Sequence, residues 1–166
     1  ESLCKTTSGT SNVALGAYAM CVNTEGANNT AVGVASLLVN TTGIQNTAVG
    51  RNALVANTTA SGNVAVGAHS LQTNTTGFSN VAVGTCQPSG YGAALELNTT
   101  GDCNVAVGNG ALRSNTTADN NTALGTLAMG CNTTGTRNTA VGKLALQNNT
   151  TATDQVAIGH EALDAA

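Results

Sequence analysis

Cysteine spacing is the first feature of the sequence that indicates chemistry. The same 17-residue spacing separates Cys4 from Cys21 and Cys86 from Cys103. Cysteines that a regular fold brings within about 4.4–6.8 Å, measured between Cα atoms, can form a disulfide. Two pairs at one spacing predict the disulfides Cys4–Cys21 and Cys86–Cys103, and favour an oxidising, extracellular setting such as a cell or virion surface. Cys131 is left over, either as a free thiol or as a link to another chain.

The triplet Asn-Thr-Thr is the second chemical signal, because Asn-X-Thr is the acceptor pattern for N-linked glycosylation. The asparagines of this triplet are Asn40, Asn57, Asn74, Asn98, Asn115, Asn132 and Asn149. Asn28, Asn120 and Asn148 also begin acceptor patterns. The alternative is structural, because asparagines stacked at regular intervals form hydrogen-bonded ladders that turn their side chains inward. Both interpretations are open at this stage.

Residue types for catalysis or metal binding are present but scattered. His69 and His160 stand alone, there is no Cys-X-X-Cys pair, and no Ser or Cys has a partner base at a fixed spacing. The glycines mark turns and form no phosphate-binding loop. We therefore expect a protein that is not an enzyme and that needs no metal or cofactor.

One repeated phrase explains these spacings. Asn-[Thr/Val]-Ala-[Val/Leu/Ile]-Gly begins at Asn12, Asn29, Asn46, Asn63, Asn80, Asn104, Asn121 and Asn138, and a ninth copy begins at Gln155. The copies follow one another at a 17-residue interval, except from Asn80 to Asn104, where the interval is 24. We number slots 1–17 from that asparagine. Slot 3 is Ala and slot 9 is Leu or Met in every copy, and no charged residue occupies slots 1–5.

The repeat is too short for a helical unit, and slots 1–5 alternate with the period of a β-strand. We expect one strand at slots 1–5 and a second at slots 8–12, with turns at the glycine of slot 5 and at slots 13–17. This predicts an all-β fold: a parallel β-solenoid of about ten 17-residue coils, forming a single domain over residues 1–166 with one insertion of 24 − 17 = 7 residues.

Slot 3 raises the question of which side chains face the interior. We expect slots 2 and 4 to point inward with slot 9, and the alanine of slot 3 to point outward. A constant small residue on the outside has two explanations. Either a second backbone packs against it by self-association, or the roll is so thin that both of its faces are crowded.

Composition limits the partners. Charged residues make up 8 % of the chain, the net charge is −3, and there is no cluster of Lys or Arg. Nucleic acid and anionic membrane surfaces are therefore unsuitable partners. The longest mainly apolar run, residues 13–22, is too short to be inserted in a bilayer. Both ends break off within a repeat, and open coil edges predict head-to-tail stacking into a filament, unless the ends are only the limits of a larger protein.

Several copies of the phrase resemble a known motif. NVALG at 12–16, NVAVG at 63–67, 80–84 and 104–108, and QVAIG at 155–159 resemble the motif of the heads of trimeric autotransporter adhesins. The fuller phrase NTAVGxxALxxNTTG is similar to repeats in fibre-like proteins of phages, viruses and bacteria. The resemblance implies a left-handed β-roll assembled as a trimer. The chain departs from adhesin heads in its longer repeat and in lacking a neck, stalk and anchor.

We accordingly expect an extracellular structural fibre subunit or adhesin-like rod that self-associates. The alternative is a receptor- or glycan-binding module of a tail fibre or adhesin. Its contact loop would be the insertion at 85–91, with Gln87, Pro88 and Tyr91 as contact residues. Ice binding by the Thr rows is a third possibility. It is disfavoured because adjacent threonines in slots 13 and 14 would alternate faces or lie in a turn.

Overall fold

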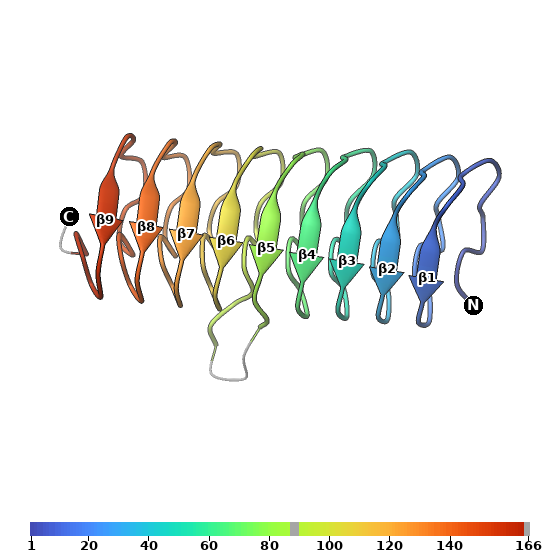
Figure 1. Cartoon of the computed structure of the whole chain (residues 1–166), viewed down its shortest axis with the longest axis horizontal. Coiled ribbons are helices and arrows are strands. Elements are labelled where there is room, and N and C mark those ends of the chain that lie inside the picture. The colour runs from blue at the N-terminus through green and yellow to red at the C-terminus, as the bar shows by residue number, and fades with distance from the viewer. Residues whose placement is uncertain (87–89, 165–166) are drawn as a thin grey trace.

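The chain folds into a row of stacked coils, each contributing one short strand to a single sheet (Figure 1). The structure is a computed structural model that describes residues 1–86 and 90–164. The strands are β1 (Val13–Leu15), β2 (Thr30–Val32), β3 (Thr47–Val49), β4 (Val64–Val66), β5 (Val81–Val83), β6 (Val105–Val107), β7 (Thr122–Leu124), β8 (Thr139–Val141) and β9 (Val156–Ile158). All neighbouring strands are parallel and follow chain order, and the described residues contain no helix. The predicted all-β parallel solenoid is confirmed.

The register of the sheet is that of the repeat. Ala14 pairs with Ala31, and Ala82 pairs with Ala106 across the longer step, so slot 3 always lies beside slot 3. The additional residues lie between Cys86 and Ala94. Cys86 N still donates to Ala68 O (3.2 Å) as a slot-7 residue does, and Leu71 N donates to Ala94 O (3.2 Å) as slot 9 does to slot 8. The coil therefore accommodates the insertion between slots 7 and 8, slightly later than the predicted 85–91.

The predicted facing of the strand is wrong. The slot-3 alanines of β2 to β8 are fully buried, whereas slots 2 and 4 lie on the outer face of the sheet. The slot-3 alanines share the core with the Leu or Met of slot 9. The strand alternates as predicted, but slot 3, which was predicted to point outward, faces the core. The interior of the coil is thin, so a methyl group fits opposite the slot-9 side chain where a Val would not.

The second predicted strand is also wrong. Slots 8–11 form turns and slot 12 lies in no strand, and the residues of slots 7 and 9 have left-handed backbone conformations, for example Ala35 (φ 56°) and Leu37 (φ 48°). A non-glycine residue with positive φ is uncommon and persists only where surrounding contacts hold it. Here the contacts are hydrogen bonds between coils, such as Leu37 N to Ala53 O (3.0 Å). Slot 9 nevertheless faces the core as predicted.

The glycine of slot 5 is required where each strand ends. Gly108 has φ 132°, and a Cβ atom built on it would lie 2.6 Å from the carbonyl oxygen of Gly125 in the next coil. Both the backbone conformation and the close approach exclude a side chain there. This explains why the residue recurs at every coil.

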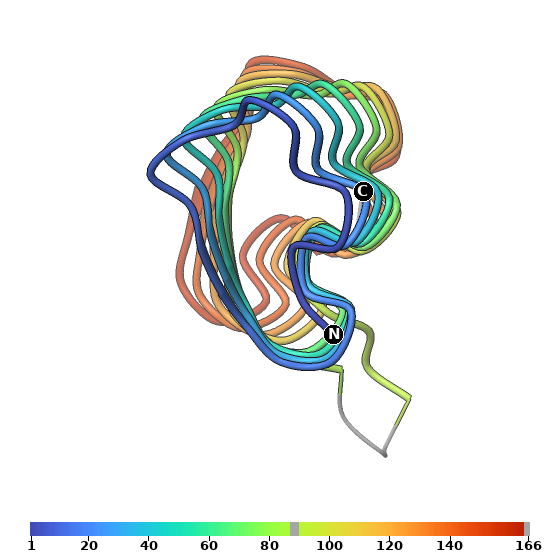
Figure 2. The same cartoon turned by 90° about the vertical axis from the view of Figure 1, so that its right-hand side faces the viewer.

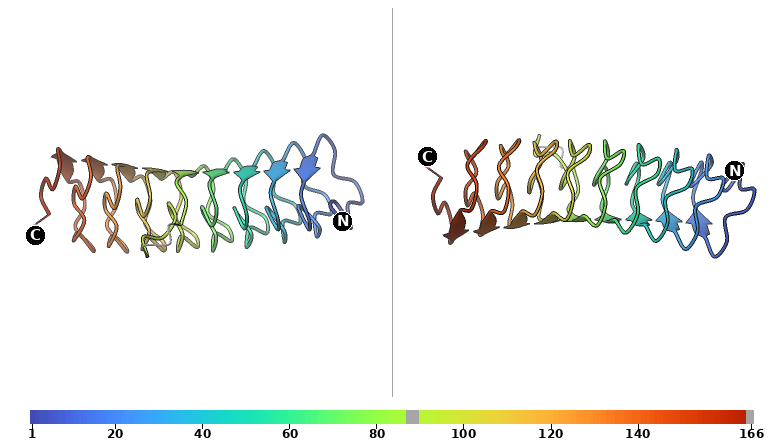
Figure 3. Two further views of the ribbon diagram at one scale, coloured as in Figure 1. Left: turned by 90° about the horizontal axis from the view of Figure 1, so that it is seen from below. Right: turned by 90° about the horizontal axis from the view of Figure 1, so that it is seen from above.

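The coils form a narrow rod. Seen along its axis, the chain traces the same closed outline coil after coil, with a slight rotation between successive coils (Figure 2). The strands lie along one side of the rod and the turns along the other (Figure 3). The rod therefore has one side formed by strands and another formed by turns along its length (Figure 3).

Candidate functional site

A ladder of asparagine side chains runs through the interior at slot 12. Each Nδ2 donates to the Oδ1 of the asparagine one coil earlier, at 2.8–3.1 Å, from Asn40–Asn23 through Asn149–Asn132. The same Nδ2 also donates to the carbonyl of slot 15, at 2.8–3.2 Å. Both amide hydrogens are thus used within the protein. The ladder interpretation of the Asn-Thr-Thr triplets is confirmed.

The same geometry contradicts glycosylation of these asparagines in the folded chain. The predicted acceptors have side chains with no exposure to solvent, apart from Asn149 with 5 %. They are Asn40, Asn57, Asn74, Asn98, Asn115, Asn132 and Asn149. A sugar on such an amide would replace a hydrogen that forms a buried bond, in an interior with no room for it. These seven positions are therefore corrected from candidate glycosylation sites to structural ladder residues.

A second ladder occupies slot 1. The Oδ1 of each slot-1 asparagine accepts the backbone N–H of slot 1 in the next coil, at 2.9–3.0 Å. Its Nδ2 donates to the slot-15 carbonyl, at 2.7–2.9 Å. The slot-15 carbonyl therefore receives hydrogen bonds from both ladders. For example, Gly77 O accepts from Asn63 and Asn74. The two ladders are joined in every coil, which ties the turn region to the strand.

The Thr rows lie in turns, as expected for adjacent threonines. The slot-13 hydroxyls donate to the slot-13 carbonyl of the next coil at 2.9–3.4 Å, from Thr7–Thr24 to Thr133–Thr150. The slot-14 threonines are exposed and lie in a single row. Slot 13 therefore serves the stacking of the coils, and the two slots do not form a wide hydroxyl plane. The ice-binding hypothesis loses the surface on which it was based.

The outer face of the sheet was missed by sequence reasoning. Its slot-4 row is aliphatic in all nine strands: Leu15, Val32, Val49, Val66, Val83, Val107, Leu124, Val141 and Ile158. Its slot-2 row contains only Val and Thr. At the two ends of the sheet, Leu15 and Ile158 are 67 % and 72 % exposed. The slot-4 residues of the inner strands are at most 38 % exposed, because neighbouring strands cover part of each side chain. The sequence shows that slot 4 is always aliphatic, but the sequence-based prediction is that this slot points into the core.

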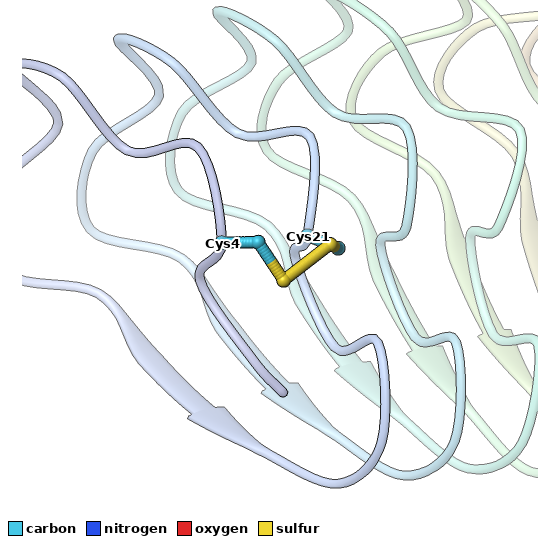
Figure 4. The surroundings of a disulfide bond; sticks show 2 residues. All are labelled: Cys4 and Cys21. Atoms are coloured by element: carbon cyan, nitrogen blue, oxygen red, sulfur yellow. A yellow bond between two sulfur atoms is a disulfide. The ribbon is translucent and has the colours of Figure 1, made fainter.

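Cys4 and Cys21 form the predicted disulfide (Figure 4). Both occupy slot 10, and stacking of consecutive coils brings their Cα atoms to 4.6 Å. The bond links the N-terminal segment, which contains Cys4, to the next coil, which contains Cys21. This prediction is confirmed.

The predicted disulfide between Cys86 and Cys103 is wrong. Cys86 lies in slot 7, whereas Cys103 lies in slot 17, where its backbone N–H donates to Phe78 O (3.0 Å). Their 17-residue separation includes the insertion, so in the coil they are 17 − 7 = 10 slots apart. The structure does not join them, and both residues are exposed. Cys131, in slot 11, is also exposed and forms no disulfide with any described residue.

The described parts of the insertion leave the outline of the coil on the side of the turns that follow the strands (Figures 1 and 2). Of the predicted contact residues, Gln87 and Pro88 lie outside the described residues, and Tyr91 is 44 % exposed. Where the chain returns to the coil, Glu96 and Arg113 stack in slot 10 of neighbouring coils and form an ion pair, with 3.4 Å between Arg113 Nε and Glu96 Oε2. A side chain at Gly92 would collide with both members of that pair. The base of the insertion is thus closely packed against the rod.

The remaining charges lie on the surface. Arg137 and Asp154 form a bidentate pair between coils, at 2.7 and 2.8 Å. The hydrogen bond from Arg137 lowers the pKa of Asp154 below its ordinary value. Across residues 1–86 and 90–164, no group of three His, Cys, Asp or Glu side chains could hold a metal ion. Within the same ranges, no helix is long and apolar enough to cross a bilayer.

Comparison with known proteins adds no relative, since no family model, curated protein or solved structure matches the chain. The resemblance to adhesin heads and fibre repeats stays a prediction. The functional argument therefore depends on the surfaces of the rod themselves.

Proposed function

We propose that the chain is a structural rod of an extracellular fibre or adhesin-like assembly, and that it associates laterally with copies of itself through the outer face of the sheet. The observation that carries the proposal is the slot-4 row, which is aliphatic in every strand although it faces outward. Surface rows such as slots 6 and 17 vary from coil to coil and accept charge. A continuous exposed apolar surface is typical of an interaction site.

Stiffness is the property that suits the fold to a structural role. Each coil is bonded to the next by the strand, by two asparagine ladders and by the slot-13 threonines. Nine strands at about 4.8 Å give a rod on the order of 40 Å long. Bending this rod would stretch several buried hydrogen bonds at once. The fold therefore supports a role in which length and shape are the useful properties.

The size of the sheet face fits a second copy as its partner. Slots 1–5 span about 16 Å at roughly 3.3 Å per residue, so nine strands present an area on the order of 700 Å². A standard protein interface covers about 800 Å² on each partner. Because slots 1–5 carry no charge in any coil, packing two such faces together leaves no unpaired ion buried.

The test is to place charge in the middle of this face. Val66→Lys combined with Val83→Lys puts two cations in neighbouring slot-4 positions. The matched control is Gln72→Lys with Gln147→Lys in slot 10, the slot that already holds Arg113. Light scattering after size exclusion should give multiples of 16.3 kDa for the native chain and for the control, and a monomer for the slot-4 variant. Circular dichroism checks that all three are folded.

Two results would refute lateral association. One is a native chain that is monomeric at every concentration up to its solubility limit. The other is a slot-4 variant that is folded and assembles as the native chain does. Electron microscopy of the same samples tests the rod itself, since globular particles would contradict the structural role.

A receptor- or glycan-binding role is the second candidate, and the projecting insertion favours it. Deleting residues 87–93 restores the 17-residue step and should leave the rod and its association intact. Loss of binding to a glycan array on deletion would assign recognition to the insertion. No binding by the native chain would exclude glycan recognition of this kind.

A further inference from the structure

We propose that the seven Asn-Thr-Thr asparagines of slot 12 accept an N-linked glycan only while the chain is unfolded, and that the folded chain accepts one only at Asn28, Asn120 and Asn148. Glycosylation at slot 12 and folding then exclude each other. The proposal concerns modification of the single folded chain, before any association through the outer face of the sheet.

The chemistry of the transfer makes slot 12 unreactive after folding. The asparagine Nδ2 attacks C1 of an oligosaccharide held on a lipid pyrophosphate. An N–C1 bond forms, the C1–O bond to the pyrophosphate breaks, and one Nδ2 proton passes to a base of the transferase. In the folded chain both protons of Asn57 Nδ2 are donated, to Asn40 Oδ1 (2.9 Å) and Ala60 O (3.1 Å). The side chain of Asn57 is also completely buried.

A glycan attached before folding would have the opposite effect. It would remove one of the two hydrogens from its ladder position and place a bulky polar group at a site without solvent exposure. The ladder continues from coil to coil, so a single modified asparagine interrupts the stacking of the coils on both sides. A chain that carries a slot-12 glycan is therefore expected to stay unfolded.

The other acceptor patterns lie on the surface. Asn28 and Asn120 occupy slot 17, are exposed, and their side chains form no hydrogen bond with any described residue. The threonines of their patterns, Thr30 and Thr122, lie in slot 2 on the outer face of the sheet. Asn148 donates its Nδ2 to Asp164 O (3.0 Å) and Asp164 Oδ1 (3.2 Å). Both partners and Asn148 are at the surface, so the difference from slot 12 is solvent exposure and not the number of hydrogen bonds. The three acceptor side chains are therefore open to solvent from outside the rod.

The consequence concerns the route by which the rod is made. The seven slot-12 patterns lie in consecutive coils, so a nascent chain that meets an N-linked glycosyltransferase offers acceptors along most of its length. The Cys4–Cys21 disulfide calls for an oxidising compartment. The chain must therefore reach an oxidising compartment and also keep its slot-12 asparagines unmodified. A route in which it folds before, or apart from, N-linked glycosylation meets both requirements.

The experiment compares the two states of the same full-length chain. In one arm, the purified folded chain is incubated with a solubilised oligosaccharyltransferase and its lipid-linked oligosaccharide. In the other, the chain is translated into microsomes, where it meets the enzyme before it folds. Mass spectrometry of peptides after glycan release in heavy-oxygen water gives the occupancy of each asparagine. Limited proteolysis reports whether the glycosylated chains are folded.

Two variants provide matched controls. Thr76→Ala removes the acceptor pattern at Asn74 without touching the ladder. Thr30→Val removes the pattern at Asn28 and introduces the residue that slot 2 holds in five other coils. Each is expected to lose occupancy at its own asparagine alone and to keep the protease resistance of the folded rod.

We expect occupancy at Asn28, Asn120 and Asn148 in the folded arm. In the microsomal arm we expect occupancy at slot 12, with loss of protease resistance. Three results would overturn the proposal: slot-12 occupancy in the folded arm, slot-12 glycans on a chain as protease-resistant as the unmodified one, or no occupancy at the three exposed sites. Self-association through the outer face would cover Thr30 and Thr122, so the folded arm is also run on the Val66→Lys/Val83→Lys variant, which is expected to be monomeric.

Discussion

Replacing Asn74 by alanine measures what the buried ladder contributes to stability. Asn74 Nδ2 donates to Asn57 Oδ1 (3.1 Å) and Gly77 O (2.8 Å), and its Oδ1 accepts from Asn98 Nδ2 (2.9 Å). Alanine removes all three hydrogen bonds. Gly77 O and Asn98 Nδ2 each keep one other hydrogen bond. Asn57 Oδ1 is left without a donor in the interior.

The magnitude follows from these losses. A buried hydrogen bond contributes about 1 kcal/mol net, and an unsatisfied buried acceptor costs about 1–3 kcal/mol. The bonds to Gly77 O and from Asn98 Nδ2, at about 1 kcal/mol each, and the stranded acceptor of Asn57, at about 1–3 kcal/mol, together predict that the free energy of unfolding falls by roughly 3–5 kcal/mol. Thr76→Ala in the same coil is the matched control, because that side chain is exposed and forms no hydrogen bond with any described residue. Its expected effect is within about 0.5 kcal/mol.

Urea denaturation followed by circular dichroism gives both values. Because repeat proteins can unfold in parts, amide hydrogen exchange should accompany it and show the loss of protection concentrated in the coils beside Asn74. A decrease for Asn74→Ala that differs from the control by less than about 1 kcal/mol would refute the reasoning, since that is the net value of a single hydrogen bond.

Three further predictions follow from the turns and the surface. Gly108→Ala should unfold the chain or reduce its thermal midpoint strongly, because its Cβ would meet the next coil at positive φ, whereas Gly130→Ala has more room and ordinary φ and should be tolerated. Cys4→Ser removes a disulfide with a sequence separation of 17 and should cost about 3 kcal/mol in chemical denaturation, with reduction of the native chain giving the same loss. The Arg137–Asp154 pair stabilises the fold above the unfolded pKa of the carboxyl, and this contribution is lost as the pH falls through the lower folded pKa. NMR titration should therefore show a lower Asp154 pKa in the native chain than in Arg137→Ala, and equal values would contradict the pairing.

The register of the solenoid could be predicted from the sequence because a strict period leaves one way to stack the copies. The facing of the strand could not. Alternation defines two faces but does not say which is buried, and β-branched Val is a more usual core residue of strands than Ala. The slot-9 side chain already fills the thin coil, so the opposite wall has room for a methyl group only. The residues of slot 2 indicate which face is outside, since Thr30 and Thr47 would need hydrogen-bond partners if they faced an apolar interior.

The turns and the second cysteine pair show two other limits of sequence reasoning. Leu in a left-handed conformation is locally disfavoured, so no propensity would place Leu37 or Leu54 there, and only bonds to neighbouring coils hold them. The 17-residue spacing of Cys86 and Cys103 is not one coil, because the insertion between them places the two cysteines in different slots. Spacing predicts contact only where the chain between two residues follows the repeat.

Lateral association as proposed would depend on the number of coils in the rod. Each coil adds the same hydrogen bonds along the axis and the same strip of apolar surface on the outer face, so rods of any length have equivalent surfaces. The favourable free energy of packing two faces grows with the number of coils, whereas the loss of translational and rotational freedom is incurred once per association. Association should therefore appear above a threshold number of coils. A chain of three or four coils, made by removing whole 17-residue copies, would stay monomeric under conditions in which the full rod associates. Repetition of one coil is in this view the means by which individually weak aliphatic contacts become a stable interface.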